Sequence, residues 1–229
     1  MLMFDFLTEI ECGKPIATRS QIFGGNETCL GCIPWQVALE NVVENGTQDC
    51  GGTIVSPRYV VTAAHCVWGK SPEDVKVHAG IVDYLDEDAT IHRVKKLHIH
   101  DEYYDEGYDY DYAILELENP IDIEGDSRSR AACLPDKNDG KNFDENTVLR
   151  TSGWGFGSDE PNLLKDIFVT WKSEEVCQPL MPVHPVQGEP IKYTPRMICA
   201  GHGPEEIYDR ACKGDSGGNF IPPIFWTFT

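Results

Sequence analysis

The sequence predicts an all-β protein, either a sandwich or a barrel. Short runs rich in β-branched and aromatic residues recur along the chain, turn residues separate them, and few long helical periods occur. The 229 residues suffice for one large domain or for two packed barrels of about 100 residues each. A hydrophobic content of 41% fits a globular protein with a substantial core.

The expected elements begin after residues 1–21, which read as a leader and tether. In that segment Cys12-Gly13-Lys14-Pro15 cannot continue a helix. Ser56-Pro57-Arg58 supplies the turn between two expected strands. The expected strands are 34–39, 52–55, 59–62, 75–77, 114–117, 148–150 and 167–171.

The chain is strongly acidic, with 38 Asp and Glu residues against 19 Lys and Arg residues and a formal net charge of −19. Phosphate binding depends on clustered Lys and Arg, so nucleic acid is not an expected partner. No apolar run approaches the roughly 18 residues of a membrane span, so a membrane is not expected either. The Asp-, Glu- and Tyr-rich segment 101–110 could bind a cation or a basic partner, but a solvated loop is favoured.

Cysteine usage points to an oxidising compartment. The chain has nine cysteines, and their odd number leaves at least one without an intramolecular partner. Asn26-Glu27-Thr28 and Asn45-Gly46-Thr47 are glycosylation acceptor patterns, which matter outside the cytosol. Residues 1–7 are too short and too acidic for a signal peptide. We therefore expect a secreted protein whose leader is missing from this sequence.

Three separate segments carry residues suited to nucleophilic catalysis. Glycines surround Ser216 in Cys212-Lys213-Gly214-Asp215-Ser216-Gly217-Gly218, where a sharp turn can expose the hydroxyl and direct backbone N–H groups at an anion. His65 ends the segment Thr62-Ala63-Ala64-His65, and Asp111 stands at the entrance to an apolar strand. Taken singly, such a histidine is more often structural and such an aspartate a solvated strand end. Together they supply a base, an acid and a nucleophile.

With these segments in view, the chain resembles a trypsin-like (chymotrypsin-fold) serine protease. The resemblance implies two packed antiparallel Greek-key β-barrels, the second incomplete at its C-terminal end. It divides the chain into a leader over 1–21 and a protease domain over 22–229, with the first barrel at about 22–130 and the second at about 131–229. The matching pieces are Ile22-Phe23-Gly24-Gly25, Cys50-Gly51-Gly52, Ala63-Ala64-His65-Cys66, Asp111-Tyr112-Ala113-Ile114-Leu115, Ser152-Gly153-Trp154-Gly155 and the segment from Cys212 to Gly218.

The resemblance also assigns the catalytic roles. Ser216 is the expected nucleophile, His65 the general base, and Asp111 the acid that orients His65, with Asp109 as a nearby rival for that role. The backbone N–H groups of Gly214 and Ser216 are expected to form the oxyanion hole. This chemistry implies no cofactor.

No metal is expected either. Four acidic residues fall near the calcium loop of the family, but Ile81 stands where an acidic ligand is usual. The four are Asp83, Asp86, Glu87 and Asp88.

Members of this family are made as precursors, which here implies cleavage before Ile22. The new ammonium group would pair with Asp215 and shape the oxyanion site. An unpaired buried Asp215 would cost roughly 3–5 kcal/mol. Gln21 stands where a basic residue is usual, so we expect a trypsin-like activator to cut after Arg19 instead and to leave an overhang on Ile22.

The resemblance leaves two interpretations of the substrate pocket. Arg210 occupies the position of the pocket floor, where an arginine would oppose basic substrate side chains and favour acidic ones. Its neighbour Asp209 would favour basic side chains if the loop slipped by one residue. The interpretation with Arg210 is preferred.

The same resemblance implies a disulfide pattern that uses six of the cysteines. The implied pairs are Cys50 with Cys66, Cys177 with Cys199, and Cys12 with Cys133, the last of which would keep the leader attached after cleavage. Cys29 and Cys32 either bridge one another, or Cys29 lacks its family partner, because Asp166 stands near the place of that cysteine. Cys212 finds no cysteine downstream of the serine.

The sequence supports one leading function and one alternative. The leading hypothesis is a secreted serine endopeptidase with a protein or peptide substrate, an activating protease and protein inhibitors as partners. The alternative is a non-catalytic protease homologue that acts as a binding or regulatory module. The intact triad favours the enzyme, whereas Gln21 and the short end after Asn219 favour the homologue. That end is expected to be truncated, leaving an open edge on the second barrel.

Overall fold

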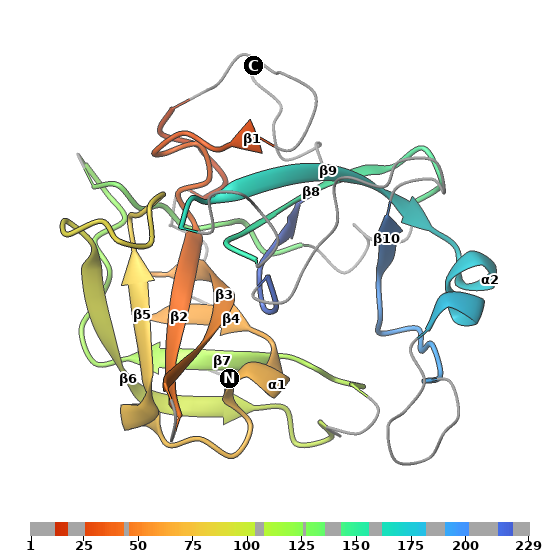
Figure 1. The fold of residues 1–229 in the computed structure, drawn as a ribbon, viewed down its shortest axis with the longest axis horizontal. Coiled ribbons are helices and arrows are strands. Elements are labelled where there is room, and N and C mark those ends of the chain that lie inside the picture. The colour runs from red at the N-terminus through yellow and green to blue at the C-terminus, as the bar shows by residue number, and fades with distance from the viewer. Residues whose placement is uncertain are drawn as a thin grey trace.

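The protein consists of a closed β-barrel with a second β-sheet beside it (Figure 1). The structure is a computed structural model. It describes residues 12–17, 26–43, 46–103, 108–125, 127–135, 143–155, 162–181, 191–201 and 215–221. The all-β prediction is confirmed, since the helices of the described residues are short turns between strands.

Six antiparallel strands close the barrel in the order β2-β3-β4-β7-β6-β5. They are β2 (Gln36–Val43), β3 (Gly46–Ser56), β4 (Tyr59–Thr62), β5 (Val75–Ala79), β6 (Thr90–Ile99) and β7 (Ala113–Leu117). The short helix α1 (Ala64–Val67) follows β4, and a 3-10 turn (Pro72–Asp74) precedes β5. Each expected strand of this half lies within or largely overlaps an observed one.

The barrel core arises from the two-residue period of its strands. In β7 the residues alternate between buried and half-buried, so that Ala113, Leu115 and Leu117 face the interior. Gly52 of β3 lets two other core side chains approach closely, because a Cβ at this position would lie 2.9 Å from both Val37 and Val60. The result is one contiguous apolar core inside the barrel.

The second sheet follows the path β1-β9-β8-β11, and β10 also pairs with β9. Its strands are β1 (Asn26–Glu27), β8 (Val148–Gly153), β9 (Lys165–Lys172), β10 (Cys199–Gly201) and β11 (Phe220–Ile221). The helix α2 (Glu174–Cys177) and a 3-10 turn (Gln178–Leu180) follow β9. Within the described residues this sheet does not close into a barrel.

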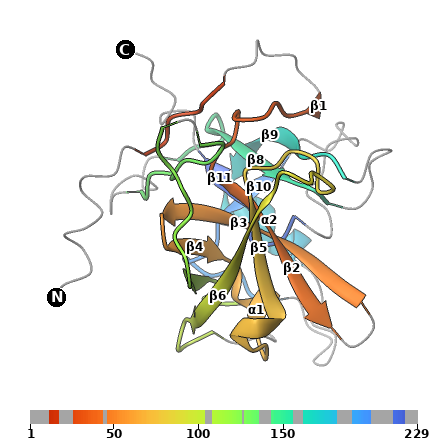
Figure 2. The same cartoon turned by 90° about the vertical axis from the view of Figure 1, so that its left-hand side faces the viewer.

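The two halves are not separate along the chain. β1 belongs to the segment expected in the first barrel, yet it pairs with β9 of the second sheet. Both views place β8 and β9 above the barrel, and β11 lies with them (Figure 2). Among the described residues, no helix has the length and apolar character needed to cross a membrane.

Candidate active site

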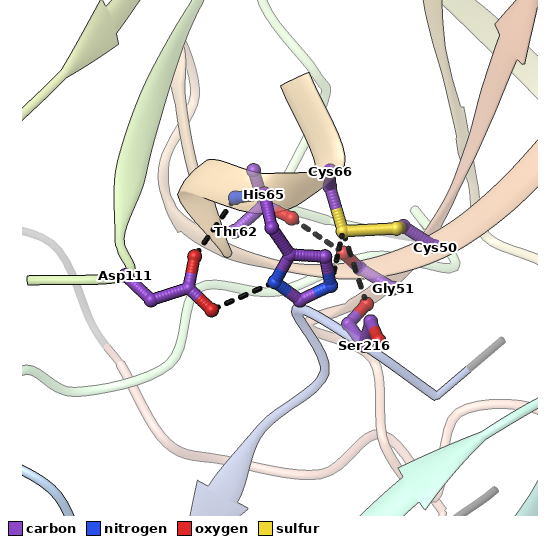
Figure 3. Close-up of a disulfide and its surroundings, with 7 residues drawn as sticks. All are labelled: Cys50, Gly51, Thr62, His65, Cys66, Asp111 and Ser216. Atoms are coloured by element: carbon purple, nitrogen blue, oxygen red, sulfur yellow. Dashed lines mark hydrogen bonds and ion pairs between the residues drawn. A yellow bond between two sulfur atoms is a disulfide. The ribbon is translucent and has the colours of Figure 1, made fainter. Parts of the chain in front are cut away.

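His65 and Asp111 meet because the strands next to them in the chain are paired. β4 pairs with β7 so that Thr62 lies opposite Ala113, which brings the start of α1 beside the residue that enters β7. The backbone N–H of His65 donates to Asp111 Oδ1 at 2.8 Å, and His65 Nδ1 lies 2.7 Å from Asp111 Oδ2 (Figure 3). The carboxylate therefore binds the histidine at two points.

This contact decides how the imidazole can act. A carboxylate only accepts hydrogen bonds, so the proton of the neutral His65 ring lies on Nδ1. Nε2 is then left with a lone pair that can accept a proton. The two side chains are 26% and 21% exposed, so solvent screens their interaction only in part.

Ser216 lies beside the Nε2 edge of the His65 ring (Figure 3). Its carbonyl oxygen accepts a hydrogen bond from the Gly51 N–H at 2.6 Å, which anchors it to β3. Cys66 Sγ, in a disulfide with Cys50, lies 3.7 Å from both His65 Nε2 and the Ser216 carbonyl oxygen. Among the described residues, no hydrogen bond joins His65 Nε2 to the Ser216 hydroxyl. Such contacts are often long without substrate and tighten when it binds.

The two glycines after Ser216 are required by the space around the turn. Gly217 has φ +78°, and a Cβ there would lie 2.2 Å from Thr62 Oγ1 and 2.5 Å from the Gly51 carbonyl oxygen. A Cβ at Gly218 would lie 2.8 Å from the carbonyl oxygen of Ser152. The backbone of Gly217 and Gly218 therefore fits between β3, β4 and β8 only because neither residue has a side chain.

The carboxylate of Asp215 fits into a space kept open by two further glycines. The Gly155 N–H donates to Asp215 Oδ1 at 2.8 Å. A Cβ at Gly153 would lie 2.1 Å from Oδ1, and one at Gly155 would lie 2.4 Å from Oδ2. The motif Ser152-Gly153-Trp154-Gly155 thus provides a pocket for the acidic residue that precedes Ser216.

A buried polar network connects the segment after Ser216 to both sheets. Asn219 Nδ2 donates to Gln36 Oε1 and, at 3.0 Å, to Ser152 Oγ, and Ser152 Oγ donates to Gln36 Oε1 at 2.9 Å. The three residues come from the segment before β11, from β2 and from β8, and each is at most 6% exposed. Only Ser152 had a signal in the sequence, through its motif, because Gln36 and Asn219 are single polar residues that form no motif.

Comparisons with known proteins cover most of the chain. The family model described as Trypsin matches residues 22–223. The chain is 35% identical to a trypsin of Simulium vittatum over 208 residues, which is 87% of this chain and 77% of that protein. It is 34% identical to coagulation factor XI of Bos taurus over 213 residues, which is 90% of this chain but only 32% of factor XI.

The chain belongs to the trypsin family. The resemblance to trypsin-like serine proteases is thereby confirmed, and the closed barrel with its partial second sheet is the two-barrel all-β fold of that family.

Several predicted site residues of this trypsin-family chain lie outside the described residues. They are Ile22, Asn45, Asp209, Arg210, Cys212 and Gly214. The other predicted glycosylation residue, Asn26, lies in β1.

The structure joins eight cysteines in four disulfides. They are Cys12–Cys133, Cys29–Cys32, Cys50–Cys66 and Cys177–Cys199. Of the two possibilities left open for Cys29, the structure has the bridge to Cys32. His65 lies close to both sulfur atoms of the Cys50–Cys66 bridge, but disulfide sulfurs offer no thiolate, so these three residues do not fit a metal site.

The acidic loop near the position of the family's calcium loop is paired with an arginine from another segment. Arg128 donates to Asp86 Oδ2 and to Asp88 Oδ2, each at 3.1 Å. A guanidinium group between these two carboxylates opposes a metal ion there.

Asp109 and Asp111, the two candidates for the acid role, have different partners. Asp109 accepts hydrogen bonds from Arg196 Nε at 2.8 Å and from Thr194 Oγ1 at 3.1 Å, whereas Asp111 binds His65. The Arg196 guanidinium holds the pKa of Asp109 below its ordinary value. The structure therefore brings Asp111, and not Asp109, to the imidazole.

Tyr108 also contacts the imidazole and was not expected from the sequence. Its ring meets the His65 ring edge to face, with centroids 6.0 Å apart. Tyr108 is 46% exposed and lies at φ +51°, a conformation that bulky residues rarely adopt. A tyrosine within an acidic loop gives no sequence signal for such a position.

Proposed function

We propose that this chain is a secreted serine endopeptidase with a catalytic triad of Ser216, His65 and Asp111. The observation that carries the proposal is the two-point contact of Asp111 with His65, beside Ser216. Membership in the trypsin family supports the reaction class. The four disulfides support an oxidising compartment outside the cytosol.

The reaction begins with the Ser216 hydroxyl, which attacks the carbonyl carbon of the peptide bond. His65 Nε2 accepts the hydroxyl proton as the Oγ–C bond forms and later gives it to the leaving amine. Asp111 keeps the Nδ1 proton in place and stabilises the imidazolium that develops. Water then attacks the acyl-enzyme with His65 again as the base, which releases the acid and restores Ser216.

The oxyanion of the tetrahedral intermediate is held by the backbone N–H groups of Gly214 and Ser216. Removing one such donor reduces the rate by about 10²–10³-fold in related chemistry. Cleavage before Ile22 completes this hole, because the freed ammonium would pair with Asp215 next to Gly155. The precursor is thus kept inactive until an activating protease acts.

Substrate preference depends on the pocket floor, for which we propose Arg210. A peptide panel that varies the residue before the cleaved bond tests this choice. Preferred cleavage after Asp or Glu supports Arg210, and cleavage only after Lys or Arg supports Asp209. Protein inhibitors that fill the same pocket are the expected regulatory partners.

Labelling with a fluorophosphonate tests the proposed function directly. The full chain, processed to a free Ile22 N-terminus, should be labelled on Ser216, and peptide mapping would locate the label. Ser216→Ala is the matched control and should remain unlabelled. N-terminal sequencing after trypsin treatment also tests activation, since the Gln21-Ile22 bond should resist trypsin.

The alternative function is a binding or regulatory module without catalysis. One feature of the sequence favours it, namely Gln21 in place of the basic residue that is usual before the activation cleavage. An unlabelled Ser216 in a folded sample with a free Ile22 N-terminus would support this alternative.

A further inference from the structure

The turn that carries Asp111 contains two residues in an unfavourable backbone conformation. It lies between β6 and β7, and within it Tyr108 and Tyr110 have φ values of +51° and +55°. Side chains with a Cβ rarely occupy this region, and such residues persist only where the surroundings enforce them. Asp109 lies between the two tyrosines, so whatever holds Asp109 also holds the strained turn.

A cationic side chain from the second half of the chain holds Asp109. Arg196, in the segment before β10, donates to Asp109 Oδ1 through Nε at 2.8 Å and to Oδ2 through Nη2. Thr194 Oγ1 adds a third hydrogen bond at 3.1 Å. This two-point contact of a guanidinium with a carboxylate fixes orientation as well as distance.

The same guanidinium also lies over Tyr110. Arg196 Cζ is 4.5 Å from the centroid of the Tyr110 ring, and that ring stacks on His100 at 4.4 Å with an interplanar angle of 7°. His100 directly follows β6. One arginine of the second half thus contacts the turn at two consecutive residues and links them to the barrel.

We infer that Arg196 is a positioning residue for the Asp111–His65 pair. The inference rests on the proposed function for its catalytic consequence. Arg196 touches neither the triad nor the reacting atoms. It acts through Asp109 and Tyr110, which hold the turn in the shape that directs Asp111 at His65 Nδ1 and places Tyr108 edge to face with the His65 ring. Without Arg196 the backbone at 108–110 relaxes toward ordinary φ values, and Asp111 shifts relative to the imidazole.

If the ion pair of Arg196 with Asp109 only stabilised the fold, Arg196→Ala would change neither the hydrogen bond of His65 Nδ1 nor kcat. Arg196 is 42% exposed in its side chain, and exposed pairs contribute little to stability. Arg128 offers a matched control, since its side chain is 39% exposed and also binds two carboxylate oxygens, those of Asp86 and Asp88. Among the described residues of the turn that carries Asp111, none is in contact with Arg128.

The test follows the hydrogen-bonded Nδ1 proton of His65 by proton NMR in the full chain. This proton should resonate far downfield, and its loss in Asp111→Asn assigns it. In Arg196→Ala the signal should move upfield or broaden by exchange, whereas Arg128→Ala should keep it. Arg196→Lys should recover the signal only in part, because an ammonium lacks the planar fork.

Kinetics on the processed chain supply the second readout. Arg196→Ala should lower kcat by about ten- to a hundredfold with little change in KM, because misalignment affects the reaction more than binding. Arg128→Ala should leave kcat unchanged. An unchanged downfield proton and an unchanged kcat in Arg196→Ala would overturn the inference. If Arg196→Ala does not fold, Asp109→Asn, which keeps the shape of the side chain, is judged by the same two readouts.

The two proposals fail in different ways. A wild-type chain that hydrolyses nothing and takes no fluorophosphonate label would refute the proposed function, while the Nδ1 proton would still decide the role of Arg196. A labelled wild type with an unperturbed Arg196→Ala signal would refute the inference alone.

Discussion

The two sides of the candidate site are built in different ways. His65 and Asp111 are placed by the register of β4 on β7 inside a closed barrel, and their hydrogen bonds follow from that register. Ser216 is instead held by its contact with Gly51 and by the buried network around Gln36, which spans the two sheets. The register of one barrel therefore brings the base and acid together, and the contact of Arg196 with Asp109 adds to it from the second half. The nucleophile depends on how the two halves fit together.

The largest effect is expected on the base side, from Asp111→Asn. The amide can no longer hold the correct tautomer of His65, and kcat should fall by about 10⁴-fold. The free energy of unfolding should change little, since the barrel strands remain paired. Steady-state hydrolysis and thermal unfolding of the processed chain measure the two quantities. A fall of only a few fold would mean that Asp111 is not the orienting acid.

On the nucleophile side, Gly217→Ala should be the most damaging change. Alanine is strained at this positive φ, and its Cβ would clash with Thr62 Oγ1 and the Gly51 carbonyl oxygen. We therefore expect the free energy of unfolding to fall by about 2–5 kcal/mol and the activity to be lost. Gly69→Ala is the matched control, because Gly69 has φ +73° but no atom within 4 Å of an added Cβ. The free energy of unfolding of Gly69→Ala should fall by only about 1–2 kcal/mol, and this variant should keep its activity. If denaturant titrations gave the same loss of unfolding free energy for both variants, the close packing around Gly217 would be unimportant.

A smaller effect is expected from Gln36→Leu, which removes the shared acceptor of Ser152 and Asn219. The buried Ser152 hydroxyl is left without its acceptor, which costs about 1–3 kcal/mol, whereas Asn219 Nδ2 still donates to Ser152 Oγ. Ser216 should also become less well placed. Ile54→Val, a change in the barrel core, should cost about 0.5–1.5 kcal/mol without affecting kcat. If kcat per folded molecule stays unchanged in Gln36→Leu, the network does not position the nucleophile.

The smallest effect concerns the acid stability of the barrel. The pKa of Glu40 lies below its ordinary value of 4.5, because hydrogen bonds from Lys76 and then from His78 favour the carboxylate despite its partial burial. A lowered pKa stabilises the fold above about pH 4.5, and this stabilisation is lost as the pH falls through the folded value. In Glu40→Gln the free energy of unfolding should therefore fall less steeply with decreasing pH below pH 5 than in the wild type. Asp101→Asn, in an exposed loop, should retain the wild-type slope.

The sequence predicts those strands that are rich in apolar residues. It does not predict strands that form mainly because neighbouring strands pair with them. β4 and β7 are rich in β-branched or leucine side chains and were expected. β6 was not expected, because only Val94 is fully buried in it and charged residues such as Lys95 and Lys96 face outward. It forms a strand because β5 and β7 flank it and satisfy its backbone.

A similar limit applies to the site. His65, Asp111 and Ser216 could be proposed from the sequence because their motifs occur together in the order of a known family, although each motif alone is a weak signal. The partners of Asp109 and Gln36 left none, since Arg196 and Asn219 lie far away along the chain and meet them only through tertiary packing. The contacts that join the two halves are therefore what sequence reasoning cannot supply.

Acylation of Ser216 tests the proposed relay most directly. The full chain with a free Ile22 N-terminus is mixed with an activated ester and quenched in acid at increasing times. After digestion, the mass of the peptide that contains Ser216 is measured by mass spectrometry. The triad predicts a burst of leaving group equivalent to the enzyme, an acyl group on Ser216 that later disappears, and no burst in His65→Ala. A folded, processed chain that never acquires the acyl group would contradict it.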